Sequence, residues 1–248
     1  MSYAIAVAGK GGTGKTTFAA IAITLMKNAG KRPILAIDAD PNANLGESLG
    51  IPYSKTVSDI LEQTKGMRDL PAGVNKLQMV EMELHNALVE TPGVDLLVMG
   101  RPEGPECYCA ANNLLRTFTK TLALNYPYIV LDNEAGMEHL SRKTTQNIEV
   151  LYLVSDYSIV GIRAVARIRD LVRDLKLAVN KMLVVINKSP SPSLPPQLTA
   201  ELEKYKLSLA GILPVDEQII NADLNKLPIG SLPQSSPMMI KVREILQI

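Results

Sequence analysis

The sequence predicts an α/β fold: a mostly parallel, twisted sheet of about seven strands with helices on both faces. Short runs of Val, Ile and Leu alternate with longer segments of helical periodicity, which is typical of strand–helix–strand units with right-handed crossovers. The chain has 248 residues, 46% of them hydrophobic, which suffices for one large packed core. Since no change in composition divides the chain, we expect a single domain over residues 1–248.

Seven apolar runs are candidates for the strands. Six are continuous, as strands covered on both faces are, and the seventh is weaker. They are Ala4–Ala8, Ile34–Ile37, Val94–Met99, Tyr128–Leu131, Val150–Val154, Met182–Ile186 and, as the weaker run, Ser208–Leu213. Helices are expected at Thr16–Asn28, Ala111–Leu124, Ile159–Leu175 and Gln197–Tyr205. Residues 52–92 predict a mixture of helix and loop, and four prolines within Ser189–Pro196 exclude a helix or central strand there.

The charge of the chain is nearly balanced, with 26 basic and 25 acidic side chains and a net charge of +1. This balance favours neither nucleic acid nor a membrane as a partner. The N-terminus lacks the pattern of a signal peptide, and no run approaches the ~18 apolar residues of a membrane span. Two cysteines are too few for a disulfide framework. We therefore expect a cytoplasmic protein with free thiols.

The segment Gly9–Thr17 follows the first strand, opens the first helix and matches the phosphate-binding pattern G-x-x-x-x-G-K-[ST]. Glycines let backbone N–H groups surround phosphate oxygens, and the helix N-terminus adds partial positive charge. Lys15 is expected to reach the β- and γ-phosphates, and the Thr16 hydroxyl to ligate Mg²⁺. The sequence therefore predicts an ATPase that uses ATP with Mg²⁺. The residues assigned to the nucleotide in this loop are Gly9, Lys10, Gly11, Gly12, Thr13, Gly14, Lys15, Thr16 and Thr17.

Lys10 is a second basic side chain in this loop, and binding of the nucleotide does not require it. With K-G-G-T-G-K-T-T, the sequence resembles the deviant Walker A family of P-loop ATPases, which includes the MinD and ParA ATPases and the nitrogenase iron protein. The resemblance implies a homodimer in which Lys10 reaches the partner's nucleotide. A cation supplied in this way stabilises charge that develops during phosphoryl transfer. The alternative is a solvated lysine at the tip of a loop.

Carboxylates follow two of the predicted strands. Asp38 and Asp40 come after the second strand and Asp132 after the fourth, at the edge where open α/β sheets bind ligands. The resemblance assigns Asp38 and Asp132 to Mg²⁺ through water, and Asp40 to orienting the attacking water. Gly136 resembles the switch glycine that moves with the γ-phosphate. For Asp38 and Asp40, the alternative is a capped turn before a helix.

Three residues near the carboxyl ends of later strands are candidates for contact with the adenine base. Asn187 follows the sixth strand, and its amide can both donate to and accept from an adenine edge. Pro214 and Asp216 lie in G-I-L-P-V-D, which resembles the family's late loop that packs on the base. Ordinary turn residues are the alternative at all three positions.

Both cysteines fall in Cys107-Tyr108-Cys109, after a loop rich in Gly and Pro and before a predicted helix. Thiolates near a helix N-terminus are favoured electrostatically. One pair supplies two thiolates, whereas tetrahedral Zn²⁺ or square-planar Ni²⁺ usually has four ligands, so two pairs across a two-fold dimer would complete a site. The alternative is a pair of small buried hydrophobic side chains.

Two segments narrow the resemblance: G-R-P-E-G-P-E-C-Y-C-A-A-N-N-L-L-R at 100–116 and D-N-E-A-G-M-E-H-L-S-R at 132–142. They look like the CooC/AcsF family of nickel-insertion ATPases, which mature carbon monoxide dehydrogenase and acetyl-CoA synthase. The resemblance implies that Cys107 and Cys109 bind Ni²⁺, or Zn²⁺, at a dimer interface, and that ATP hydrolysis is coupled to insertion of nickel into one of these client enzymes. Two alternatives stay open: a spatial regulator of the MinD or ParA type, and an iron–sulfur scaffold ATPase.

Overall fold

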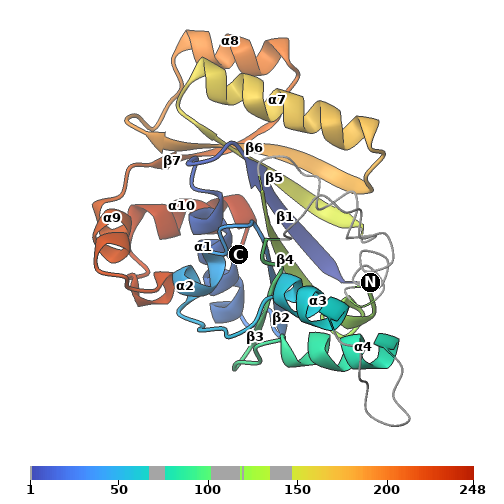
Figure 1. The fold of residues 1–248 in the computed structure, drawn as a ribbon. Helices are drawn as coiled ribbons and strands as arrows, with labels where there is room; N and C mark the ends of the chain where they lie inside the picture. The colour runs from blue at the N-terminus through green and yellow to red at the C-terminus, as the bar shows by residue number, and fades with distance from the viewer. Residues whose placement is uncertain (1, 67–75, 102–117, 119, 135–146) are drawn as a thin grey trace.

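The computed structural model describes residues 2–66, 76–101, 118, 120–134 and 147–248. Within these residues a single sheet of seven parallel strands has the order β3-β2-β4-β1-β5-β6-β7 (Figure 1). The strands are β1 (Tyr3–Gly9), β2 (Ile34–Ala39), β3 (Val94–Val98), β4 (Tyr128–Asn133), β5 (Ile148–Asp156), β6 (Val179–Ser189) and β7 (Leu209–Pro214). The predicted fold class is confirmed, and all seven predicted runs are strands.

All of the strands except β3, which ends one residue before Met99, continue past the predicted apolar runs at their carboxyl ends. Asp38 lies on β2 and Asp132 on β4, not after these strands as the sequence had indicated. Backbone pairing explains the difference: Asp38 and Asp132 are partners in the parallel register of β2 and β4. The register, rather than side-chain hydrophobicity, decides where these strands end.

Helices cover both faces of the sheet, and the alternation of side chains along β1 shows the division. Ala4, Ala6 and Ala8 face the side covered by α3 (Val57–Gly66), α4 (Lys76–Asn86), α7 (Ile159–Asp174) and α8 (Pro196–Lys204). Ile5 and Val7 face the side covered by α1 (Lys15–Asn28), α2 (Leu45–Leu49), α9 (Glu217–Leu224) and α10 (Pro237–Leu246). Two apolar layers, one on each face of the sheet, therefore form the core.

The predicted helices are largely confirmed where the structure describes them. α1, α7 and α8 match the predictions within two residues at each end, and Pro196 is the first residue of α8, where a proline needs no amide partner. Of the helix predicted at Ala111–Leu124, residues 111–117 and 119 lie outside the described residues. Residues 52–92 contain α3 and α4 with connecting segments, as predicted, whereas α2, α9 and α10 were not predicted.

Helix α1 is buried on most sides because it lies between the sheet and the helices α2 and α10 (Figure 1). Its segment Phe18–Ile23 has no exposed side chain, which explains why this helix lacks a polar face. The C-terminal helices thus form an outer layer over α1, and they fix the helix that begins at the phosphate loop.

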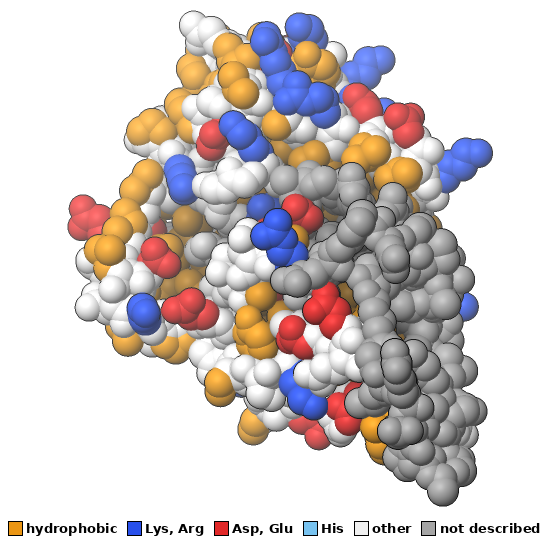
Figure 2. Space-filling model, viewed as in Figure 1, with side chains coloured by type: hydrophobic (Ala, Val, Ile, Leu, Met, Phe, Trp, Pro, Cys, Tyr) orange, Lys and Arg blue, Asp and Glu red, His pale blue; other side chains and the backbone are white. Residues whose placement is uncertain are grey.

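Basic side chains gather over α7 and α8, at the top of Figure 2. Part of this charge is neutralised locally. Arg163 of α7 forms an ion pair with Glu201 of α8 at 2.6 Å, and Arg169 pairs with Asp170, also at 2.6 Å. Among the described residues, no helix has the length and apolar character that a bilayer span needs.

Asp216 joins the two C-terminal helices. It is the N-cap of α9, where one carboxylate oxygen accepts from the backbone N–H of Gln218 at 2.9 Å. The other oxygen accepts from the Ser236 hydroxyl at 2.6 Å and from the backbone N–H of Met238 at 3.0 Å, at the start of α10. Burial alone would raise the pKa of Asp216, but these hydrogen bonds outweigh it and hold the pKa below its ordinary value of 3.8.

We expect Asp216→Ala to destabilise the fold by about 2 kcal/mol at pH 7, since it removes one N-cap and leaves buried donors without an acceptor. Because the folded-state pKa is depressed, the stabilisation is complete above pH 3.8 and is lost as the pH falls through the folded-state pKa. Urea unfolding of both proteins at pH 7 measures the loss. Asp223→Ala, which removes an exposed carboxylate at the other end of α9, is the control and should change little. Equal stability of Asp216→Ala and wild type would contradict the capping role.

Candidate nucleotide site

The phosphate loop between β1 and α1 has a backbone conformation that requires glycine. Gly12 and Gly14 have φ angles of 77° and 89°, in the left-handed region. A Cβ atom on Gly9 would lie 2.1 Å from the Val154 carbonyl oxygen, and one on Gly14 would lie 2.3 Å from Nδ2 of Asn187. The loop is closed by Thr13, whose hydroxyl donates to the Lys10 carbonyl at 2.8 Å. The glycine spacing thus reflects close packing as well as the phosphate-binding pattern.

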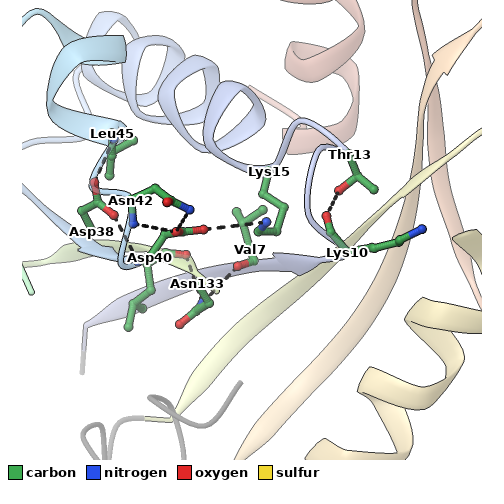
Figure 3. A network of polar contacts seen from close by, with 10 residues as sticks. Val7, Lys10, Thr13, Lys15, Asp38, Asp40, Asn42, Leu45 and Asn133 are labelled. Carbon is green, nitrogen blue, oxygen red and sulfur yellow. Dashed lines mark hydrogen bonds and ion pairs between the residues drawn. The ribbon is translucent and has the colours of Figure 1, made fainter. Parts of the chain in front are cut away.

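The two lysines of the loop have different environments (Figure 3). Lys15 is buried, with 6% of its side chain exposed, and its Nζ lies 4.0 Å from Oδ2 of Asp40. Lys10 is exposed and points away from Lys15 and Asp40. Lys15 is therefore placed to act within its own site. A role of Lys10 in a partner's site stays a prediction.

Asp38 and Asp132 form a pair of buried carboxylates on neighbouring strands. Both side chains are fully buried, and by strand alternation they lie on the face that α1 covers. Asp38 accepts hydrogen bonds from the backbone N–H groups of Leu45 (2.8 Å) and Asp40 (3.2 Å). Among the described residues, neither oxygen of Asp132 has a hydrogen-bond partner within normal geometry, although the Thr16 hydroxyl lies close enough to favour its charged form.

Both carboxyl groups have strongly raised pKa values. Burial raises the pKa of Asp132 to about 7 and that of Asp38 to about 6. The negative charge of Asp38 adds to the shift of Asp132, and that of Asp40 adds to the shift of Asp38. For Asp132, the Thr16 hydroxyl and Lys15 oppose the shift without cancelling it. Two adjacent carboxyl groups that lack a full counter-charge fit a divalent cation, and the oxygen ligands present, with the hydroxyl of Thr16, are those that Mg²⁺ prefers.

Asp40 lies in the turn between β2 and α2. Its Oδ1 accepts from the backbone N–H of Asn42 at 3.0 Å and from Nδ2 of Asn42 at 2.9 Å, while Oδ2 is the oxygen near Lys15. The alternative of a capped turn thus describes the local hydrogen bonds of Asp40 well, yet the turn also brings Asp40 to the phosphate loop. Asn42 was not predicted as a site residue, although it stands two positions after Asp40.

Asn187 and Lys188 hold the phosphate loop from the end of β6. Nδ2 of Asn187 donates to the Thr13 carbonyl at 2.8 Å, and its Oδ1 accepts from the backbone N–H of Lys188 at 2.8 Å. Nζ of Lys188 donates to the Gly12 carbonyl at 2.9 Å. Both polar atoms of the Asn187 amide are therefore used within the protein. A contact of Asn187 with the base stays a prediction, whereas its support of the loop is observed.

A second asparagine links β4 to the strand that leads into the loop. Asn133 is buried, and its Nδ2 donates to the Val7 carbonyl at 3.0 Å and the Leu131 carbonyl at 3.3 Å. Sequence reasoning missed Asn133 and Lys188. Their positions could have indicated them: Asn133 directly follows Asp132, and Lys188 directly follows Asn187, at the carboxyl ends of predicted strands.

The remaining predicted residues are not brought into this site by the described structure. Pro214 ends β7, and the carboxylate of Asp216 is engaged by α9 and α10, so its contact with a base stays a prediction. Gly136, Cys107 and Cys109 lie outside the described residues. Within the described part of the chain, no three or more His, Cys, Asp and Glu side chains form a group that could hold a metal ion.

The two interpretations of Asn187 predict different binding. If it supports the loop, Asn187→Ala should weaken both ATP and inorganic tripolyphosphate about tenfold, because a buried hydrogen bond to the loop is lost. If it contacts only the base, tripolyphosphate affinity should not change. Isothermal titration calorimetry with Mg²⁺ measures both ligands. Asn180→Ala, at the exposed start of β6, is the matched control and should leave both affinities unchanged.

Comparison with known proteins agrees with this geometry. Residues 4–229 match the family described as "CobQ/CobB/MinD/ParA nucleotide binding domain". An uncharacterized ATP-binding protein of Methanocaldococcus jannaschii is 42% identical over 98% of this chain and 96% of its own length. The carbon monoxide dehydrogenase accessory protein CooC of Rhodospirillum rubrum is 30% identical over 88% of this chain and 86% of its own.

Among solved structures, the cell division ATPase MinD of Pyrococcus furiosus superposes with a TM-score of 0.71 at 22% identity, covering 100% of this chain and 98% of its own. A ParA family ATPase of Chlorobium tepidum gives a TM-score of 0.72 at 17% identity, covering 97% of this chain and 96% of its own. These two similarities concern the fold. The match over residues 4–229 and the sequence relatives show that the chain belongs to the CobQ/CobB/MinD/ParA family of P-loop nucleotide-binding domains.

Proposed function

We propose that this protein hydrolyses ATP with Mg²⁺ at the phosphate loop and that hydrolysis drives insertion of nickel into a client enzyme. The observation that supports the first part best is the buried Asp132 carboxylate, to which the described residues donate no hydrogen bond of normal geometry and which lies beside Thr16 and Asp38. A fully buried carboxyl group without a partner is costly unless a ligand supplies the missing interaction.

The residues of the site divide the work of hydrolysis among them. Lys15 neutralises charge on the β- and γ-phosphates, with the backbone N–H groups of the loop around them. Mg²⁺, when bound, adds charge neutralisation at the phosphates; Thr16 would ligate it, and Asp38 and Asp132 would hold it through water. Asp40 orients the attacking water, which is consistent with its position 4.0 Å from Lys15.

The nickel part of the proposal is supported by sequence. Cys107 and Cys109 supply two thiolates, and two copies of the chain supply the four that square-planar Ni²⁺ or tetrahedral Zn²⁺ takes. A homodimer would also let Lys10, which is exposed and points out of its own site, reach the partner's nucleotide. The relative that is 30% identical is named for an accessory role to carbon monoxide dehydrogenase. The proposed client is therefore carbon monoxide dehydrogenase or acetyl-CoA synthase.

Replacement of Asp132 by Asn should stabilise the nucleotide-free protein while abolishing hydrolysis. With the folded-state pKa raised to about 7, the stability of the wild type is complete below pH 3.8 and is lost as the pH rises through about 7. Without Mg²⁺ at pH 8, the free energy of unfolding of Asp132→Asn should therefore exceed that of the wild type by as much as about 4 kcal/mol. At pH 5 this difference should be smaller. Its kcat should fall by roughly two orders of magnitude.

Urea unfolding at both pH values and release of phosphate from ATP measure these effects. Asp174→Asn, an exposed carboxylate at the end of α7, is the control for a lost charge and should change neither quantity. Undiminished hydrolysis by Asp132→Asn would argue against the proposed magnesium site. Absence of hydrolysis by the wild type in the presence of Mg²⁺ would remove the ATPase proposal itself.

Anaerobic titration with Ni²⁺, combined with mass determination, tests the cysteine pair. We expect one Ni²⁺ per dimer with thiolate charge-transfer absorption, and loss of both in the Cys107→Ala/Cys109→Ala variant. The variant should still hydrolyse ATP, because Lys15 and Thr16 are unchanged. Absence of nickel binding that depends on the cysteines would reduce the protein to an ATP-driven switch of unknown client, and pelleting with liposomes or DNA would then test a MinD- or ParA-type role.

A further inference from the structure

The turn that follows β2 fixes the orientation of Asp40 through a single neighbour. Two donors of Asn42, its backbone N–H at 3.0 Å and its Nδ2 at 2.9 Å, converge on Oδ1 of Asp40 (Figure 3). The other oxygen, Oδ2, is left facing Nζ of Lys15 at 4.0 Å. With one oxygen held twice, the carboxylate has one orientation, and a single oxygen remains available on the side of the phosphate loop.

The side-chain bond is not a by-product of the turn. Any residue except proline at position 42 could donate its backbone N–H to Asp40, whereas the bond from Nδ2 needs an amide of the length of asparagine. Neighbouring groups do not replace it, because the backbone N–H of Asp40 and that of Leu45 are both directed at Asp38. Asn42 therefore supplies the only side-chain donor to Asp40 among the hydrogen bonds of the described residues.

The turn also holds an unfavourable backbone conformation. Ala43 has a φ angle of 52°, in the left-handed region, which is costly for a residue that carries a Cβ atom. Something must hold Ala43 in this conformation. The backbone N–H of Ala43 donates to the Asp40 carbonyl at 3.0 Å, and the paired hydrogen bonds from Asn42 to Asp40 and the two backbone bonds to Asp38 hold the residues on either side.

We propose that Asn42 is a positioning residue for Asp40: it holds Oδ1 so that Oδ2 stays turned toward the phosphates. The inference rests on the proposed hydrolysis of ATP, in which Asp40 orients the attacking water. A carboxylate that is free to rotate would present Oδ2 to the water for only part of the time, so loss of the Asn42 side chain lowers the rate of the chemical step. Binding of the nucleotide depends on the loop and Lys15, which Asn42 does not contact.

The test compares steady-state hydrolysis by Asn42→Ala, Asn42→Asp and Asn44→Ala. We expect kcat to fall about tenfold in Asn42→Ala, with KM for ATP and Kd for ADP unchanged. In Asn42→Asp, which has the same shape but places a like charge against Asp40, kcat should fall further. Asn44→Ala is the matched control, because Asn44 lies in the same turn, is exposed and makes no side-chain cap to α2; it should hydrolyse ATP like the wild type.

A kcat of Asn42→Ala equal to that of the wild type would overturn the positioning role, and so would a rise in KM and Kd that accounts for the whole loss. If the wild type does not hydrolyse ATP, the proposed function fails, and crystal structures of the nucleotide-free proteins decide the inference separately. An Asp40 carboxylate turned away from Lys15 in Asn42→Ala supports the role of Asn42. An Asp40 that keeps its orientation without the Asn42 side chain overturns it.

Discussion

The parallel register of β1, β4 and β2 is the constraint on which the site depends. Val7 pairs with Asp132, and Asp132 pairs with Asp38, so both carboxyl groups lie at the level where β1 enters the phosphate loop. A slip of one residue along β4 would move Asp132 to the opposite face of the sheet and bring Leu131 or Asn133 under α1 instead. The strand pairing that builds the core therefore also places two buried acids on neighbouring strands, with Asp132 beside Thr16.

This placement carries an energetic cost. Buried carboxyl groups favour their neutral form, and burial raises the pKa of Asp132 to about 7 and that of Asp38 to about 6. These pKa values lie near neutral pH, so binding of a cation would shift both groups to the charged form. The site thus trades stability of the nucleotide-free state for affinity toward a cation and phosphates, a common compromise at functional sites.

Asparagine amides give the site its rigidity. Asn187 holds the Thr13 carbonyl, Asn133 holds the Val7 carbonyl and Asn42 holds the Asp40 carboxylate. The first bond joins the end of β6 to the phosphate loop, the second joins the end of β4 to β1, and the third lies within the turn after β2. An amide suits this work because it is neutral and can donate without adding charge to a site that must accept both a polyphosphate and a cation.

The sequence by itself determined the strands, the helices α1, α7 and α8, and the phosphate loop, because each depends on local hydrophobic periodicity or on a contiguous motif. Only the tertiary structure decided the roles of Asn187, Asp216 and Asp132. Asn187 bonds a carbonyl 174 positions away, and Asp216 caps α9 while bonding Ser236, 20 positions on. Such partners, and the lack of one for Asp132 among the described residues, follow from strand order and helix packing, which local sequence patterns do not contain.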